Sequence, residues 1–593
     1  MAPKSRSRAP PPAAAAVPLQ PIPPEAQKQQ NGPPSKTLVE RIALPMGILT
    51  LAAIASPVSQ ATLAPVFGAI PSAVNHQQAL IASSLLGFLL YHFLPKPSAG
   101  TIGQALAAYS LWIPVVQTYL FPYSTILGPT WGPILLGFLS CHALVLPATY
   151  AAAETMSALN LSARAGPYFA PVLSTSLGLL HLLSFERQFA TILPGLASLS
   201  AAFTPVKLQL LIGSTFAYLF PSKLTILALP ALAHTFLANP HFDSVRNMDV
   251  LNQQLALQNW TMLERTWSNT GYVSVLESSG MGYRVLRCDH SLLGGEFLLT
   301  DERREREGWV VNESIYSVFE TLEAVRLMED EARAGDADAR ALVVGLGIGT
   351  APKAFLAHGI ETTVVELDPV VHAYAQTYFG LPSNHISILR DAVSWASEAV
   401  TQEEREKYDY VLHDVFTGGA EPLSLFTETF IRNLRSLLNP SGAIAINYAG
   451  DVKFPLTAKV LNTIDAVFDG QCRIFRDTPH APASETEGDK VAVNDDFTNI
   501  IVFCRNTPGA ITFRRPVKED FLGSKSREQY LLPNPRLEIP FPLHNSPNRR
   551  QRVRAEALQV GEEQQWSAQQ VESAKKHWYV MRKVLPDVVW ELW

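Results

Sequence analysis

Hydrophobic positions are distributed unevenly along the 593 residues of the chain. Between residues 42 and 240 they form long apolar runs, which only seven Lys, Arg, Asp or Glu side chains interrupt. From residue 271 onward short apolar strands alternate with amphipathic segments and polar turns. The pattern predicts two structural parts, an α-helical region over 42–240 and an α/β region after it.

Most apolar runs of the first part are about as long as the ~20 residues that a bilayer core requires, but the last three are short or interrupted by proline. They lie near 43–66, 78–95, 103–122, 128–152, 167–185, 188–205, 208–220 and 224–239. We therefore expect a polytopic membrane domain of six to eight helices, with the lipid bilayer as the partner of residues 42–240. A soluble helical bundle is the alternative, but its helices would need charged outer faces, which 79–94 and 132–153 lack.

The histidines His142, His181 and His234 fall inside these runs. An ionisable group inside a membrane is a candidate for a functional site such as a proton path. Because the neighbouring runs offer no paired carboxylates, we expect neutral imidazoles that hydrogen-bond between helices.

Charge also differs between the two parts. The first 240 residues hold eleven basic and four acidic side chains, net +7, and the rest hold 36 and 49, net −13. This acidic balance argues against a nucleic-acid partner, because Lys and Arg supply that affinity.

The Pro- and Ala-rich tail over 1–41 is expected to be disordered. An even number of spans would put this tail on the same side of the membrane as the α/β part. Arg41, Lys96, Arg164 and Lys207 then favour the cytosol for that side.

Four cysteines, Cys141, Cys288, Cys472 and Cys504, occur without CxxC spacing and without a cluster of histidines. The sequence therefore predicts neither a disulfide framework nor a metal site.

The second part is expected to hold a small β unit with a helix over 265–330, a Rossmann-like domain over 338–510 and a C-terminal extension over 511–593. In the Rossmann-like domain the predicted strands lie at 341–346, 362–367, 386–389, 408–415, 443–447, 472–475 and 499–504. The predicted helices lie near 350–358, 369–379, 392–400, 424–438 and 454–467. This alternation predicts a parallel sheet covered on both faces, with a ligand at the carboxyl ends of the strands.

Two of these strand ends have the residues of a nucleoside site. Gly345, Gly347 and Gly349 form a turn where glycine lets the backbone approach a ligand, although tight turns also use glycine for geometry alone. Glu366 ends the second strand 21 residues after Gly345, a distance at which a carboxylate accepts hydrogen bonds from ribose hydroxyls. Asp368, which precedes a proline, better fits a helix cap.

Two further strand ends add aspartates. Asp391 follows the third strand and can accept a hydrogen bond from an adenine amino group, and Asp414 follows the fourth strand and faces the reacting end. Either aspartate can instead cap a helix. NAD is the competing ligand, but Thr350 stands where the dinucleotide pattern has its third Gly or Ala, and the two aspartates have no comparable use there. An S-adenosylmethionine-type nucleoside fits better.

In this order and spacing the residues resemble the spermidine/spermine synthase family, whose fold is close to that of class I S-adenosylmethionine-dependent methyltransferases. The resemblance extends from about Ser268 to Cys504 and includes 344–349, 366–368 and 408–414. It implies a nucleoside site made by Gly345, Gly347 and Gly349 at the methionine-derived chain, Glu366 at the ribose, and Asp391 and Ala392 at the adenine.

The resemblance also implies that Asp414 is the general base, since an amine nucleophile must lose a proton to react. Where the synthases have acids that hold the ammonium groups of decarboxylated S-adenosylmethionine and of the polyamine, this chain has Ile348 and Thr417. A desolvated cation needs such partners, whereas intact S-adenosylmethionine balances its ammonium with its own carboxylate.

We therefore expect a membrane-anchored transferase that uses S-adenosylmethionine and no metal to methylate an amine or a protein. A polyamine aminopropyltransferase that uses decarboxylated S-adenosylmethionine is the first alternative. A catalytically weak domain that binds a nucleoside and regulates the membrane part is the second. A homodimer is a further expectation.

Overall fold

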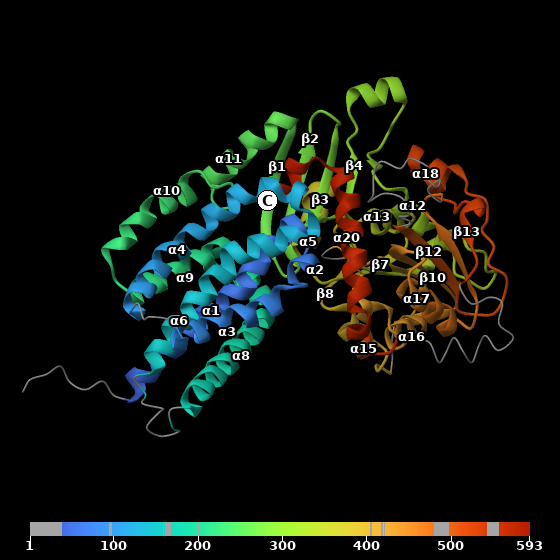
Figure 1. The fold of residues 1–593 in the computed structure, drawn as a ribbon. Coiled ribbons are helices and arrows are strands. Elements are labelled where there is room, and N and C mark those ends of the chain that lie inside the picture. The colour runs from blue at the N-terminus through green and yellow to red at the C-terminus, as the bar shows by residue number, and fades with distance from the viewer. Residues whose placement is uncertain are drawn as a thin grey trace, which may run out of the picture.

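A computed structural model describes residues 38–93, 98–157, 159, 166, 168–199, 201–403, 406–416, 419, 421–479, 497–541 and 557–593. A bundle of helices lies beside an α/β part, and the helix α20 (Ser567–Val584) runs along the boundary between them (Figure 1). Residues 1–37 of the expected disordered tail, and Lys96, Arg164 and Thr417, fall outside the described residues.

The bundle contains long apolar helices. They are α1 (Leu38–Phe67), α3 (His76–Phe93), α4 (Ala99–Leu120), α5 (Ser124–Gly137), α6 (Ala143–Ser157), α8 (Phe169–Leu199), α9 (Pro205–Leu219) and α10 (Leu229–Leu237), with the short α2 (Ala69–Ala73). A π-helical turn over Phe138–His142 joins α5 to α6. Among the described residues, three helical segments are long and apolar enough to cross a membrane, Arg41–Phe67, Ala99–Ser157 and Phe169–Ala197.

The expectation of separate spans at 167–185 and 188–205 is wrong, because α8 is one helix. The sequence suggested a loop at the charged pair Glu186-Arg187. Instead Glu186 is buried in the bundle and accepts a hydrogen bond from Ser56 of α1 at 3.2 Å. A paired carboxylate inside the bundle does not end a helix.

The histidines inside the bundle have different surroundings. His181 Nε2 lies 2.9 Å from Thr50 Oγ1 of α1, which confirms the expected hydrogen bond between helices. Nδ1 of His142 and Nδ1 of His234 have no hydrogen-bond partner among the described residues.

A small antiparallel sheet follows the helix α11 (Val245–Leu255). Its strands pair in chain order and are β1 (Trp260–Ser268), β2 (Gly271–Ser278), β3 (Tyr283–Cys288), β4 (Ser291–Phe297) and β5 (Glu313–Ser314). The helix expected within 265–330 is α12 (Ser317–Leu322), extended by a 3-10 turn over Glu323–Leu327. This unit lies between the bundle and the larger sheet (Figure 1).

The larger sheet has the order β13-β11-β12-β10-β9-β6-β7-β8. Its strands are β6 (Arg340–Val344), β7 (Glu361–Glu366), β8 (Ile386–Leu389), β9 (Tyr408–His413), β10 (Leu438–Asp451), β11 (Cys472–Arg476), β12 (Phe497–Arg505) and β13 (Glu538–Ile539). From β8 to β10 the strands are parallel, as expected. The expectation of a wholly parallel sheet is wrong, since β12 runs antiparallel to both β10 and β11.

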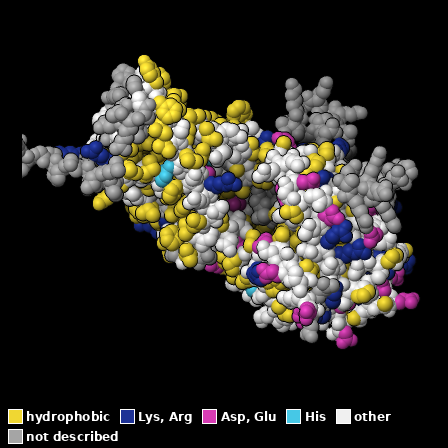
Figure 2. Space-filling model, turned by 90° about the horizontal axis from the view of Figure 1, so that it is seen from below, with side chains coloured by type: hydrophobic (Ala, Val, Ile, Leu, Met, Phe, Trp, Pro, Cys, Tyr) yellow, Lys and Arg dark blue, Asp and Glu magenta, His cyan; other side chains and the backbone are white. Residues whose placement is uncertain are grey.

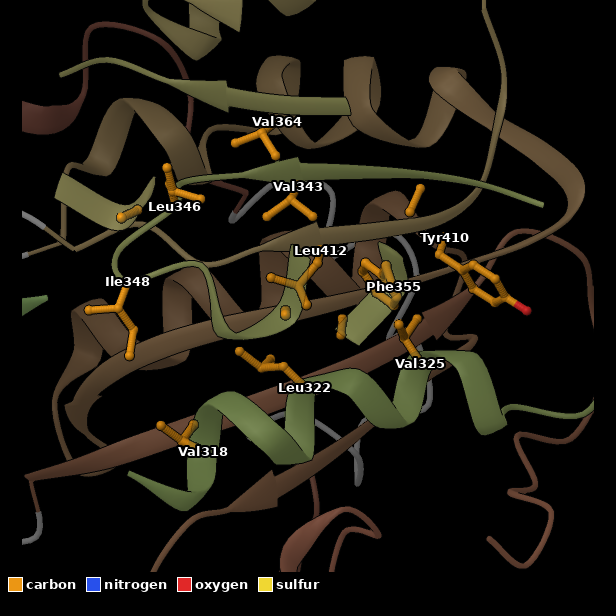
Figure 3. Close-up of a cluster of buried hydrophobic side chains, with 14 of the residues drawn as sticks. Val318, Leu322, Val325, Val343, Leu346, Ile348, Phe355, Val364, Tyr410 and Leu412 are labelled. Carbon is orange, nitrogen blue, oxygen red and sulfur yellow. The ribbon is translucent and has the colours of Figure 1, made fainter. Parts of the chain in front are cut away.

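Both faces of the larger sheet are covered. The helices between its strands are α13 (Thr350–Ala357), α14 (Pro369–Phe379), α15 (Ala392–Ala399), α16 (Glu428–Leu437) and α17 (Pro455–Val467). On one face Val343, Val364 and Leu412 pack against Leu322 and Val325 from the small unit, and each is at most 1% exposed (Figure 3). The same cluster includes Leu346 and Ile348, so the turn after β6 is fixed by core packing.

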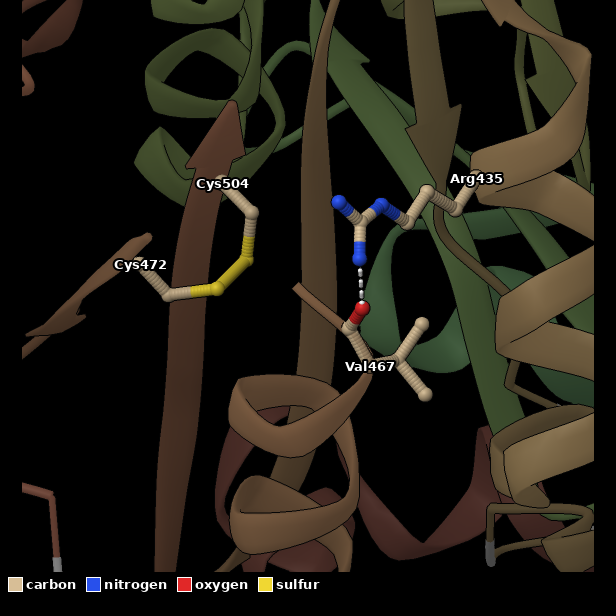
Figure 4. The surroundings of a disulfide bond; sticks show 4 residues. All are labelled: Arg435, Val467, Cys472 and Cys504. Atoms are coloured by element: carbon tan, nitrogen blue, oxygen red, sulfur yellow. Dashed lines mark hydrogen bonds between the residues drawn. A yellow bond between two sulfur atoms is a disulfide. The ribbon is translucent and has the colours of Figure 1, made fainter. Parts of the chain in front are cut away.

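The expectation that the cysteines form no disulfide is wrong. Cys472 and Cys504 face each other on the antiparallel strands β11 and β12 and form a disulfide (Figure 4). Their separation of 32 residues hides this pairing in the sequence, because it arises from strand register and not from a local motif. Nearby, Arg435 of α16 donates a hydrogen bond to the carbonyl of Val467 (Figure 4).

Candidate active site

A cavity of about 440 Å³ lies at the carboxyl ends of β6 to β10. The residues expected in the site that line it are Gly345, Gly347, Glu366, Asp391, Ala392 and Asp414. Gly349 does not line the cavity, and its role is to cap the N-terminus of α13 with a φ of 78°. The parallel order of these strands brings together residues that are up to 69 positions apart, from Gly345 to Asp414.

The glycine turn after β6 is shaped by close backbone contacts. Gly345 and Gly347 have φ values of 85° and 54°, which favour glycine. A Cβ on Gly345 would overlap the carbonyl oxygen of Asp414, and a Cβ on Gly347 would overlap that of Leu293. The turn therefore needs glycine to fit against β9 and β4 and at the same time leaves its backbone along the cavity wall.

Glu366 is held at the end of β7 by backbone amides. Its carboxylate accepts hydrogen bonds from Leu346 N at 3.0 Å and from Asp368 N at 2.8 Å. Burial raises the pKa of Glu366 to about 7. The carboxylate links the glycine turn to the second strand end and borders the cavity, where its remaining lone pairs can accept from hydroxyls.

Asp368 has the capping role expected from its place before Pro369. Its side chain accepts from Val370 N at 2.8 Å, at the first turn of α14. It also accepts from Ser268 Oγ and Thr270 Oγ1, both at 2.6 Å, and so fastens the β1–β2 turn to the larger sheet.

Asp391 combines the two roles weighed for it. Its Oδ2 accepts from Ser394 N at 2.8 Å and caps α15, so the capping alternative is correct for this atom. The residue is exposed and borders the cavity together with Ala392, so its Oδ1 stays accessible to a ligand.

Asp414 directly follows β9 and is oriented by Asn447 of β10. Asn447 Nδ2 donates to Asp414 Oδ1 at 2.9 Å. Burial raises the pKa of Asp414 to about 6, and the hydrogen bond from Asn447 opposes this shift. The carboxyl of Glu421 is buried and accepts a hydrogen bond from Ala449 N at 2.7 Å. Its pKa is raised well above the ordinary value, mainly by burial and further by the negative charge of Asp414. A carboxylate with a pKa near 6 suits proton transfer at neutral pH.

One wall of the cavity comes from outside the Rossmann-like sheet. His577, Val580, Met581 and Val584 of α20 line it. From the sequence this helix belongs to the C-terminal extension over 511–593, whose docking site the sequence leaves open. The only signal was the apolar and aromatic content of the last residues, which does not reveal where a helix docks.

The residues around the cavity fit S-adenosylmethionine. The backbone of the glycine turn, one carboxylate at the end of β7 and one at the end of β8 match a methionine-derived chain, a ribose and an adenine. Ile348, at the position where the synthases have an acid, is only 2% exposed and packs in the core, so it offers no partner for a cation.

No protein-family model matches the chain. The chain is 38% identical over 566 residues to the N-terminal histidine N-methyltransferase of Emericella nidulans, which covers 94% of this chain and 98% of that protein. It is 34% identical over 112 residues to the polyamine aminopropyltransferase of Vibrio vulnificus, across 18% of this chain and 37% of that protein. A solved structure of a probable spermidine synthase from Corynebacterium glutamicum aligns with a TM-score of 0.34 and 15% identity, covering 50% of this chain and 95% of that one.

The similarity to the Emericella nidulans protein spans both the bundle and the α/β part. The chain belongs to the family of this N-terminal histidine N-methyltransferase and is an S-adenosylmethionine-dependent methyltransferase.

Proposed function

We propose that this protein methylates an imidazole nitrogen of an N-terminal histidine in a protein substrate. The observation that supports this most strongly is the relation to the Emericella nidulans enzyme, because it covers 94% of the chain. The partly buried carboxylate of Asp414, at the strand end next to the glycine turn, would supply a base to an acceptor in the cavity.

S-adenosylmethionine would supply an electrophilic methyl group on a sulfonium. Gly345 and Gly347 would hold its methionine-derived chain, and Glu366 its ribose. Asp391 and Ala392 would hold its adenine. These roles are those that the resemblance to the spermidine/spermine synthase family implies, and all five residues line the cavity.

Asp414 and Asn447 would bind the imidazole of the acceptor. A neutral imidazole reacts through the lone pair of one ring nitrogen and has a proton on the other. When a carbon–nitrogen bond forms and the carbon–sulfur bond breaks, the ring becomes a cation and must lose that proton. The Asp414 carboxylate would accept it, and Asn447 holds the carboxylate in place for the transfer.

The bundle gives reason to propose a membrane location. Large apolar side chains are exposed on its surface, among them Phe93, Ile126, Trp131, Phe138, Leu180 and Leu211. Figure 2 shows hydrophobic side chains over the helical half, while acidic and basic side chains gather on the α/β half. An apolar surface of this kind is stable in contact with lipid tails. We therefore propose, as expected from the sequence, that residues 42–240 contact the lipid bilayer. Homodimerisation stays a prediction.

We further propose that the α/β part faces a non-cytosolic compartment. In this proposal seven described segments each cross the bilayer once: α1, α3, α4, α5–α6, α8, α9 and Lys223–Leu237. Because the number of crossings is odd, the tail and the α/β part lie on opposite sides of the membrane. The disulfide Cys472–Cys504 supports a non-cytosolic location of the α/β part, since disulfides persist in oxidising compartments. The cytosolic location expected from eight spans depended on the split of α8 that the structure does not have.

A peptide panel tests the proposed function with the full-length protein in lipid nanodiscs. The acceptors are a peptide that begins with histidine, one that begins with alanine and has an internal histidine, and spermidine. We expect methyl transfer to the first peptide alone. Equal transfer to the second peptide would contradict specificity for the N-terminus, and aminopropyl transfer to spermidine would contradict methylation.

A further inference from the structure

The helix α20 forms one wall of the cavity and is fixed from two directions. Lys576 makes an ion pair with Asp451 of β10 at 2.6 Å. On the other side Trp578 Nε1 donates to the carbonyl of Val66 at 3.0 Å, and Arg582 donates to Ser124 Oγ at 2.9 Å. These contacts attach α20 both to the sheet and to the helical bundle, so its cavity-facing side chains have defined positions.

His577 is the polar side chain that α20 presents to the cavity. It is 5% exposed, and its ring contacts two aromatic rings, with centroid distances of 4.6 Å to Phe416 and 6.1 Å to Phe497. Phe416 is two residues after Asp414, and both phenylalanines also line the cavity. His577 therefore lines the same cavity as Asp414 and contacts Phe416, the residue two positions after it, from a different element.

The ring of His577 has one nitrogen without a partner. Nε2 is buried and has no hydrogen-bond partner among the described residues. The ring hydrogen-bonds with the backbone of His290, and this bond falls on Nδ1 because Nε2 makes none. Burial lowers the pKa of His577 to about 3, so the ring is neutral and Nε2 presents a lone pair. A buried acceptor without a partner is rare unless a ligand supplies the donor.

An N-terminal histidine brings two groups that donate hydrogen bonds, its imidazole and its α-ammonium. The imidazole must reach Asp414, so the ammonium needs a second acceptor within the length of one residue. A desolvated ammonium without such a partner would be costly, whereas a neutral imidazole lone pair and aromatic faces both stabilise it.

Resting on the proposed function, we propose that His577 Nε2 accepts a hydrogen bond from the α-ammonium of the substrate, between Phe416 and Phe497. His577 is thus a specificity residue that distinguishes a free N-terminus from an internal histidine. It touches the substrate away from the reacting nitrogen, so its loss weakens binding more than turnover.

The test compares two peptides on the full-length protein in nanodiscs. One begins with histidine, and the other begins with imidazolepropionyl, which has the ring but lacks the α-amine. The variants are His577→Phe, which keeps an aromatic ring without an acceptor, and His577→Gln, whose amide oxygen can reach the place of Nε2. Tyr579→Phe is the matched control, because Tyr579 lies on the same helix with its hydroxyl turned to Gly128 of the bundle. Peptide affinity is measured by calorimetry with S-adenosylhomocysteine present, alongside KM and kcat.

We expect His577→Phe to raise the Kd and the KM of the histidine peptide about 10- to 100-fold, as for a hydrogen bond to a charged group, with kcat changed less than about threefold. Removing the α-amine should weaken binding to the wild type by a similar factor and binding to His577→Phe hardly at all. His577→Gln should recover part of the affinity, and Tyr579→Phe should match the wild type. Binding of S-adenosylhomocysteine by each variant reports that the fold is intact.

Two results overturn the assignment and are separable. If the wild type transfers no methyl group to the histidine peptide, the proposed function fails and the assignment fails with it. If the wild type methylates that peptide but His577→Phe weakens both peptides equally, or neither, the proposed function stands and the role of His577 is wrong.

Discussion

Asp414→Asn is the substitution that most directly tests the proposed chemistry. Asparagine has nearly the same size, and its Oδ1 can still accept from Asn447 Nδ2, which donates to Asp414 at 2.9 Å. Glu366 and Gly345, which we propose hold the nucleoside, are not altered. We therefore expect the affinity for S-adenosylmethionine to change less than about threefold, while kcat falls about 100- to 10,000-fold, the usual contribution of a positioned general base.

The pKa of Asp414 adds a second, independent expectation. The base works when ionised, and burial raises its pKa to about 6, so ionisation is lost as the pH falls through about 6. With that pKa the ionised fraction is about nine-tenths at pH 7 and about one-tenth at pH 5, which predicts a roughly tenfold fall in kcat/KM for the wild type, since kcat/KM reports the free enzyme. Asp414→Asn should lose this contribution to the pH dependence of kcat/KM and keep only that of the substrate's own imidazole, which both enzymes share.

The assay is single-turnover methylation of a peptide that begins with histidine, with binding of S-adenosylmethionine measured by calorimetry. Asp338→Asn is the matched control, since Asp338 is exposed and precedes β6 at the end of the sheet away from the cavity. Turnover by Asp414→Asn within about threefold of the wild type would refute the role of Asp414 as the base.

Three further predictions concern the cavity and the sheet. Gly345→Ala places a Cβ against the carbonyl of Asp414 at a φ of 85°. We therefore expect the unfolding free energy to fall by about 1–3 kcal/mol in thermal unfolding and nucleoside binding to weaken in calorimetry. Unchanged values would show that the turn can relax. Glu366→Gln turns an amide N–H toward either Leu346 N or Asp368 N, so S-adenosylmethionine should bind at least about tenfold more weakly, and wild-type affinity in calorimetry would exclude Glu366 from the site. The double substitution Cys472→Ser and Cys504→Ser opens a loop of 32 residues, so the unfolding free energy should fall by about 4 kcal/mol in chemical denaturation. Treating the wild type with a reductant should cause an equal loss, which serves as the internal check.

Much of the α/β part could be predicted because its elements follow local rules. The strand over Ile386–Leu389 and the helix over Pro369–Phe379 agree with the sequence analysis to the residue. Apolar runs bounded by glycine, proline and capping residues determine such boundaries, and Asp368 before Pro369 is one example. The strand-end position of Asp414 and Glu366 followed from the same alternation.

Features that depend on contacts between distant segments could not be predicted. The antiparallel register of β11 and β12 brings Cys472 to Cys504, and no local pattern specifies it. The burial of Glu186 against Ser56 makes α8 continuous, which charge alone does not suggest. His577 reaches the cavity because α20 docks between the sheet and the bundle, through Lys576 on one side and Trp578 on the other.

The central claim is that the protein transfers a methyl group to the imidazole of an N-terminal histidine. Its most direct test is to incubate the full-length protein in nanodiscs with S-adenosylmethionine labelled in its methyl group and a histidine-initiated peptide, and to locate the label by fragmentation in a mass spectrometer. We predict one labelled methyl group on the imidazole of the first residue. Label on the α-amine or on an internal residue would contradict the account, as would transfer of an aminopropyl group when decarboxylated S-adenosylmethionine replaces the donor.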